Sequence, residues 1–253
     1  MSPLGISCIA LVCVFGSALL GLYLQARQPD HHLSADSKDA VKLATGIIAT
    51  MAALLLGLLI SSAKSSFDQI NNELVGSAAN VVVLDRTLAD YGPETGEIRD
   101  SLKVYYKTRV NLETSGKASE VAKLDSAKMV HELEDIRAKV LHLSPGNDAQ
   151  RELQNEALHT MGEMVHARWL LMLQKDNSVS IPLVALLVAW LSIIFAAFGL
   201  FSPCNKLVVT KLFLSALSVS AAIFLILELN GPLTGLVTVS KASLYDAIAH
   251  LGQ

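Results

Sequence analysis

Long apolar runs and one long polar stretch divide the chain. Each of four apolar runs is close to the roughly 20 residues that a helix needs to cross about 30 Å of hydrocarbon. The runs are Leu4–Leu24, Leu43–Ser61, Ile181–Phe201 and Val208–Leu229. Only the last run carries charge, with Lys211 near its start and Glu228 near its end. This pattern predicts an integral membrane protein with four transmembrane helices.

The first run also has the length of the apolar core of a secretory signal peptide. A signal peptide begins with positive residues and ends in a small-residue cleavage site. Met1–Gly5 carries no positive side chain, and "YLQARQ" at the end of the run is a poor cleavage site. We therefore expect the first run to be a transmembrane helix.

The polar stretch from Lys64 to Ser178 begins with a helical pattern that continues the second apolar run. Apolar residues recur three and four positions apart, as in a coiled coil, and only Ser77 interrupts them. They are Phe67, Ile70, Leu74, Val81, Leu84, Leu88 and Tyr91. "YGPE" then stops the helix, because glycine and proline favour helix ends. No proline lies between Lys42 and Tyr91, so we expect one continuous helix or two nearly collinear helices there.

Three further helices are predicted in the polar stretch. Their apolar residues span Ile98–Leu112, Val121–Val140 and a segment from about Asp148 towards Lys175. No segment shows the period-two alternation of a strand, so the expected fold class is all-α. We divide the chain into transmembrane helices 1 and 2 at 1–62, a helical extramembrane domain continuous with helix 2 at 63–178, transmembrane helices 3 and 4 at 179–229, and a C-terminal segment at 230–253.

Composition agrees with a membrane protein and argues against other classes. The 253 residues are 52% hydrophobic with a mean hydropathy of +0.45, which is too apolar for an ordinary soluble domain. A net charge of −3 gives no basic footprint for nucleic acid. The three cysteines have neither disulfide nor metal-site spacing. We find no Gly-rich phosphate loop, nucleophile elbow or Cys-His pairing, so we expect neither an enzyme nor a cofactor.

The second apolar run carries features of a helix that packs against other copies. Small residues allow a neighbouring helix to approach closely in the membrane, and here they are Gly46, Ala49, Ala53 and Gly57. Hydroxyl side chains on the same run would be exposed in a lone copy; they belong to Thr45, Thr50, Ser61 and Ser62. We therefore expect self-association within the lipid bilayer.

Two segments resemble bestrophin ion channels. "LLLGLL" enters a long helix with an aromatic residue ten positions after the glycine, at Gly57 and Phe67, and is similar to the second transmembrane helix of bestrophins. "LELNGPLTG" (Leu227–Gly235) and then "VSKASLYDAI" (Val239–Ile248) resemble the segment after the fourth span, where a Glu, a turn and a short helix follow one another. The opening "HHLS…VKLATGIIATMAALLLGLLI…AKSSFD" is similar to bacterial four-span membrane proteins described as bestrophin-like.

The resemblance implies a homo-oligomeric ion channel, by likeness a pentamer, in the plasma (inner) membrane. In bestrophins the second transmembrane helix lines the pore and continues into the cytosolic domain. The neck positions correspond to Thr50, Leu54 and Leu58, which implies a hydrophobic constriction of the kind that gates by dewetting. Leu55 and Leu59, about 100° further round the helix, should face neighbouring helices instead.

The chain departs from the family at several positions. Bestrophins carry Arg, Tyr, Trp and Glu just after the pore glycine, whereas this chain has Leu59, Lys64, Asp68 and Gln69 there. Animal bestrophins bind calcium through acids after the last span, and "NGPLTGLVTVS" contains none, so we expect no calcium clasp. A leucine neck has no charge preference, which leaves the choice between cations and anions open.

Two Glu-x-x-His units offer a rival interpretation. Glu156 with His159, and Glu163 with His166, place two carboxylates and two imidazoles on one face of a predicted helix. Di-iron carboxylate bundles use this unit, but they take one from each of two helices. A solvated face with i, i+3 and i, i+4 pairs is the commoner explanation. Metal binding at these residues is therefore a minor alternative.

Charge leaves the orientation in the membrane open. Cations in short loops favour the cytoplasm, and five of them flank one side of the spans while four flank the other. They are Arg27, Lys38, Lys42, Lys206 and Lys211 against Lys64, Arg168, Lys175 and Lys241. The resemblance places the 63–178 domain in the cytoplasm. The alternative function is a membrane-anchored helical sensor or assembly scaffold without conduction.

Overall fold

The computed structural model describes residues 2–27, 35–115, 117–125, 127–174, 181–231 and 236–253. Over these residues the chain forms helices and turns and no strand, which confirms the all-α fold class. Within this part of the chain, four helices are long and apolar enough to cross a membrane, as predicted. They are α1 (Pro3–Arg27), α2 (Ala35–Tyr91), α7 (Ile181–Phe201) and α8 (Lys206–Leu229).

Helix α2 is a single helix of 57 residues, as the unbroken apolar pattern predicts. It ends at Tyr91 because Gly92 adopts a φ of 143°, a conformation that only glycine takes easily. Pro93 then begins the short 3-10 helix η1 (Pro93–Thr95). The buried Thr95 hydroxyl donates to the carbonyl of Leu88, which satisfies one of the acceptors that a helix end leaves free.

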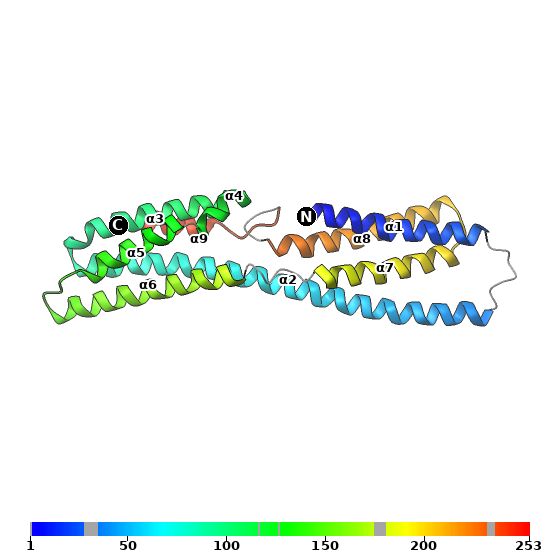
Figure 1. The fold of residues 1–253 in the computed structure, drawn as a ribbon, viewed down its shortest axis with the longest axis horizontal. Coiled ribbons are helices and arrows are strands. Elements are labelled where there is room, and N and C mark those ends of the chain that lie inside the picture. The colour runs from blue at the N-terminus through cyan, green and yellow to red at the C-terminus, as the bar shows by residue number, and fades with distance from the viewer. Residues whose placement is uncertain (1, 28–34, 116, 126, 175–180, 232–235) are drawn as a thin grey trace. The chain divides into compact units, whose positions relative to one another are not determined.

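The described helices pack into two compact units, and α2 contributes to both. We call residues 1–66 with 178–230 the membrane unit, and residues 67–177 with 231–253 the helical unit. In the membrane unit, α1 runs beside α7 and α8 (Figure 1). Its core contains apolar residues of all four helices, such as Val14, Ala52, Leu59, Leu187 and Ile223.

The helical unit includes the second part of α2. It contains α3 (Gly96–Thr114), α5 (Ala127–Leu141), α6 (Asp148–Gln174) and α9 (Ala242–His250), together with α4 (Ala118–Val121) and the 3-10 helix η2 (Ala122–Asp125). Its core includes Leu84 of α2, Leu102 of α3, Ile136 of α5, Met161 of α6 and Leu251 directly after α9. The C-terminal segment is thus a member of this core, although residues 232–235 of "LELNGPLTG" lie outside the described residues.

The helix predicted from Val121 to Val140 is shorter than expected. It begins at Ala127 as α5, and the preceding residues form α4 and η2. The guanidinium of Arg168 on α6 donates to the backbone oxygens of Leu124 and Met129. The Leu124 carbonyl therefore accepts a hydrogen bond from a side chain of another helix. The apolar spacing along a single segment cannot predict such a contact.

Candidate functional site

The first part of α2 has one face in the core of the membrane unit and one face exposed. Ala52, Leu59 and Ala63 are buried, with exposures of 3%, 3% and 0%. Leu54 and Leu58, on the other side of the helix, are 76% and 63% exposed. Among the described residues, an apolar face of the second span is therefore exposed.

The three predicted neck residues lie on this exposed face. Thr50, Leu54 and Leu58 are all exposed and follow one another at four-residue spacing, which places them along one side of the helix. The Thr50 hydroxyl donates to the carbonyl of Ile47 at 2.7 Å, so it needs no other partner in an apolar environment. Leu59 is buried and Leu55 packs against the same core, as the sequence predicts.

The predicted packing residues on α2 have room beside them. Gly46, Ala53 and Gly57 are exposed, and Ala49 packs partly against the core of the membrane unit. A Cβ atom added at Gly46 or Gly57 would meet no atom within 4 Å. The described residues therefore make no close helix contact at these two glycines, and their packing role stays a prediction.

The close helix contact within the chain lies elsewhere, between α1 and α7. A Cβ atom on Gly21 would lie 2.2 Å from the carbonyl oxygen of Ala196, and one on Gly199 would lie 2.1 Å from that of Ala18. Sequence reasoning missed both glycines. The available signal was a pair of small residues three apart in each helix, because small residues let helix backbones meet in membranes.

Exposed residues also recur three and four positions apart along the second part of α2. In the helical unit these residues are Asn72, Gly76, Ala79, Val83, Arg86 and Asp90. Steps of three and four residues keep side chains on one side of a helix. We call these residues the α2 stripe. It is apolar or uncharged until Arg86.

A buried carboxylate anchors the C-terminal segment in the helical unit. Asp85 is 1% exposed and accepts two hydrogen bonds of 2.9 Å from Arg99 and one of 3.0 Å from the Gly252 amide. Lys103 donates to the carbonyl of Leu251 at 2.6 Å. Burial by itself would raise the pKa of Asp85. The hydrogen bonds from Arg99 and Gly252, together with the Arg99 charge, outweigh burial and hold the pKa below its ordinary value.

A second buried ion pair explains the polar residue in the apolar pattern of α2. Arg109 donates to the Glu113 carboxylate at 2.7 Å and to the Ser77 hydroxyl at 2.9 Å. All three residues are buried. Burial opposes the charge of Arg109, but Glu113 outweighs it, so the pKa of the guanidinium is raised. Ser77 on α2 thus accepts a hydrogen bond from a charged side chain on α3. In the sequence it is visible only as a polar residue that interrupts the apolar pattern.

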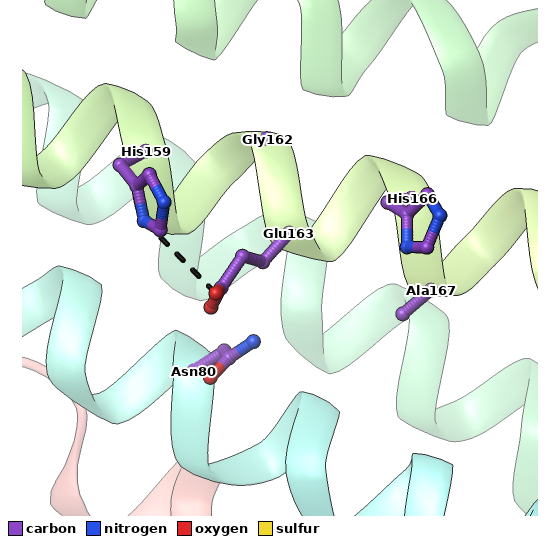
Figure 2. A pocket seen from close by; sticks show the side chains of 6 residues that line it. All are labelled: Asn80, His159, Gly162, Glu163, His166 and Ala167. Atoms are coloured by element: carbon purple, nitrogen blue, oxygen red, sulfur yellow. Dashed lines mark ion pairs between the residues drawn. The ribbon is translucent and has the colours of Figure 1, made fainter.

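The Glu-x-x-His face of α6 borders an open depression of ≈ 550 Å³ beside α2. Figure 2 shows His159, Glu163 and His166 on the side of α6 that faces Asn80 of α2. Nδ1 of His159 lies 4.0 Å from a Glu163 oxygen. Glu156 is exposed and does not line the depression. Over the described residues, no group of three or more His, Cys, Asp or Glu side chains is placed to hold a metal ion.

Comparison with known proteins gives the fold a family. Residues 12–244 match the Bestrophin-like domain family. Among curated proteins, none matches the chain. The fold is similar to crystal structures of a bacterial bestrophin homologue from Klebsiella pneumoniae. One of its variants is 14% identical, with a TM-score of 0.68 over 98% of this chain and 99% of that one. The form solved by Zn-SAD phasing is also 14% identical, with a TM-score of 0.68 over 96% of each chain.

Proposed function

Given that the chain belongs to the bestrophin-like family, we propose that it is the subunit of a homo-oligomeric ion channel whose pore is lined by α2. Copies of Thr50, Leu54 and Leu58 form successive rings around a common axis and make a hydrophobic neck. Inorganic ions are the transported species. The helices place the protein in a membrane, which we take to be the plasma (inner) membrane.

The observation that carries this proposal is the exposed face of α2. In the most apolar window of each candidate span, 17% of α2 is buried, compared with 28% of α1, 33% of α7 and 28% of α8. Of the four spans, α2 thus has the smallest buried share and the largest surface available for other contacts. The exposed face also carries Thr50 before Leu54 and Ser61 after Leu58. Hydroxyls and small residues suit helix contact and a water-filled path better than contact with lipid alone.

The leucine rings supply a physical gate. A narrow constriction lined by methyl groups holds water poorly, and an ion that crosses it must shed part of its hydration shell. The neck imposes no charge preference, because leucine side chains carry no charge. Selection between cations and anions would then depend on charged residues elsewhere along the path.

Assembly follows from the unpartnered face. We propose a pentamer, by likeness to bestrophins, in which Gly46, Ala53 and Gly57 meet helices of neighbouring copies. In the same arrangement the helical unit lies in the cytoplasm. A ring requires self-association in detergent or lipid, and native mass spectrometry that finds only monomers or antiparallel dimers would contradict it.

The proposal is tested by ion flux in liposomes with two matched double variants. Leu54→Ala/Leu58→Ala widens the neck and removes methyl groups from every ring, so flux should rise above that of the wild type. Leu55→Ala/Leu59→Ala removes the same number of atoms from the buried side of α2. It should lose stability, by about 2–5 kcal/mol for a well-packed leucine, without a gain in flux.

Both variants must be compared at equal amounts of folded protein, measured by size-exclusion chromatography and circular dichroism. A gain confined to Leu54→Ala/Leu58→Ala supports a pore at this face. Equal flux in the two variants, or no flux in either, would contradict it. The protein would then be better described as a membrane-anchored scaffold in which α2 is a support.

A further inference from the structure

The helical unit contains a groove between α3 and α5 with a volume of ≈ 800 Å³. Pockets that bind small molecules commonly have volumes of about 300–1,000 Å³. An ion pair of 2.7 Å between Lys139 and Glu97 joins the end of α5 to the start of α3 at this groove. Val104, Ile136 and Ala138 add apolar surface to its lining. The proposed channel function uses none of these residues, so a role for the groove is separate from the neck.

The groove is acidic. Four carboxylates and one ammonium group line it, which leaves three negative charges while His142 is neutral. The carboxylates belong to Glu97, Asp100, Glu132 and Asp135. Glu97 already holds the ammonium of Lys139. Asp100 and Asp135 form no ion pair with any residue that the structure describes. The excess negative charge favours a cation as the ligand.

The other polar side chains of the groove offer acceptors. The hydroxyls of Ser101 and Thr108 donate to backbone carbonyls of α3 at 2.9 Å and 3.0 Å, so their lone pairs face outward from these bonds. Nδ1 of His142 lies 2.6 Å from the carbonyl oxygen of Ala138. That oxygen can only accept, so Nδ1 carries the proton and Nε2 of the neutral ring is an acceptor. A ligand that fits this lining must supply donors.

Tyr105 supplies an independent sign of a ligand. Its side chain lines the groove and is 3% exposed. Its hydroxyl has no hydrogen-bond partner among the residues that the structure describes, yet it is not sealed from solvent as the hydroxyls of Tyr91 and Tyr106 are. The hydroxyl therefore opens to the groove. A nearly buried polar group usually has a partner, and a molecule bound in the groove can supply one.

We propose that this groove binds a linear oligoamine with three ammonium groups. Ammonium groups are donors without an acceptor, and three of them balance the excess charge of the lining. The methylene segments between them contact Val104 and Ile136, and the Tyr105 oxygen accepts one hydrogen bond. A compact metal ion fits less well, because no group of three or more ligating side chains is placed to hold one in the described part of the chain. This binding site goes beyond the proposed function and does not depend on ion conduction.

The test measures binding of spermidine, a linear triamine, to the full chain in an uncharged detergent by isothermal titration calorimetry. Low ionic strength is used because salt screens exposed charges. The wild type should bind spermidine. Asp100→Asn/Asp135→Asn removes the two groove carboxylates that have no lysine partner and should weaken binding about tenfold. Tyr105→Phe removes only the hydroxyl and should weaken binding about threefold.

The matched control is Glu134→Gln/Glu152→Gln, which removes two exposed carboxylates of α5 and α6 that do not line the groove. It should bind spermidine as the wild type does, and circular dichroism checks that every variant is folded. Absence of binding to the folded wild type would overturn the inference. Equal weakening in the two double variants, or wild-type affinity in Tyr105→Phe, would also overturn it, because surface charge alone would then explain the binding. Each of these results leaves the proposed channel untouched, since calorimetry involves no ion flux.

Discussion

The membrane unit and the helical unit complete their cores by different means. In the membrane unit, α1 and α7 meet backbone to backbone at Gly21 and Gly199. In the helical unit, buried carboxylates form ion pairs with arginines: Asp85 pairs with Arg99, and Glu113 pairs with Arg109. One unit excludes side chains from its closest contact, whereas the other brings charged side chains into its interior.

This difference follows from the two solvents. Lipid tails are as apolar as leucine, so burial of apolar surface does not drive helices together in a membrane, and close packing has to do so. In water the apolar core forms readily, and a buried charge then requires complete pairing. The membrane unit also leaves the face of Leu54 and Leu58 open. That face is therefore available for contact with lipid or with another copy of the chain.

The largest effect should come from filling the contact between α1 and α7. Gly21→Leu and Gly199→Leu each place a side chain where a backbone oxygen already lies, and backbone atoms cannot rotate away as a side chain can. We expect little folded protein by size-exclusion chromatography in detergent. Gly16→Ala on α1 is the control, since a Cβ atom there meets nothing within 4 Å. Normal folding of both leucine variants would contradict the close approach.

The next effect concerns the charge pairs of the helical unit. Asp85→Asn leaves Arg99 without its carboxylate, and losing one partner of a buried pair costs about 3–5 kcal/mol. Because Arg99 keeps 21% of its side-chain surface exposed, we expect the lower end of this range. Denaturant unfolding in detergent measures it. Glu132→Gln, which removes an exposed i, i+4 pair with Lys128, should change stability by less than about 1 kcal/mol.

The same carboxylate should make stability depend on pH on the acid side. The pKa of Asp85 is lower in the folded chain than its ordinary value of 3.8. Its contribution is therefore fully present above that value and is lost as the pH falls through the lower, folded-state pKa. Thermal unfolding of the wild type should lose stability as the pH falls below about 4, and the loss should be smaller in Asp85→Asn. Parallel curves would contradict the pairing.

The smallest effect should come from the start of α8. The Asn205 side chain accepts a hydrogen bond of 2.8 Å from the Val208 amide, which caps the helix. Replacing such a cap by alanine costs about 1 kcal/mol, so Asn205→Ala should lower the unfolding temperature slightly. Asn155→Ala, at an exposed position within α6, should be neutral or slightly stabilising because alanine favours helix. Equal changes in both would argue against the cap.

Features that depend on local spacing could be predicted from the sequence. The four spans, the continuity of α2 and its end at Tyr91 follow from apolar periodicity and from "YGPE". Contacts between distant segments could not be predicted. Ser77 interrupts an apolar pattern because Arg109, 32 residues away, donates to it, and Gly21 matters because of a carbonyl in another helix.

The candidate site, too, could be predicted from the sequence only as far as local spacing determines it. Spacing predicts that Thr50, Leu54 and Leu58 share a face and that Leu59 lies on another, and the burial of Leu59 agrees. Spacing within one chain cannot say what the exposed face meets, because that depends on other copies. The two Glu-x-x-His units are a single helix face, and only packing shows that α2 supplies Asn80 opposite them.

The place of the C-terminal segment has a consequence for biogenesis. Leu244, Ala247 and Leu251 belong to the same core as residues of α2 and α3, and the Gly252 amide reaches Asp85, 167 residues earlier in the chain. Between them the ribosome must synthesise α7 and α8, which have to enter the bilayer. Until then, the nascent helical unit lacks part of its core, and the carboxylate of Asp85 lacks the hydrogen bond from the Gly252 amide. Its final closure is therefore expected to follow insertion of the last span.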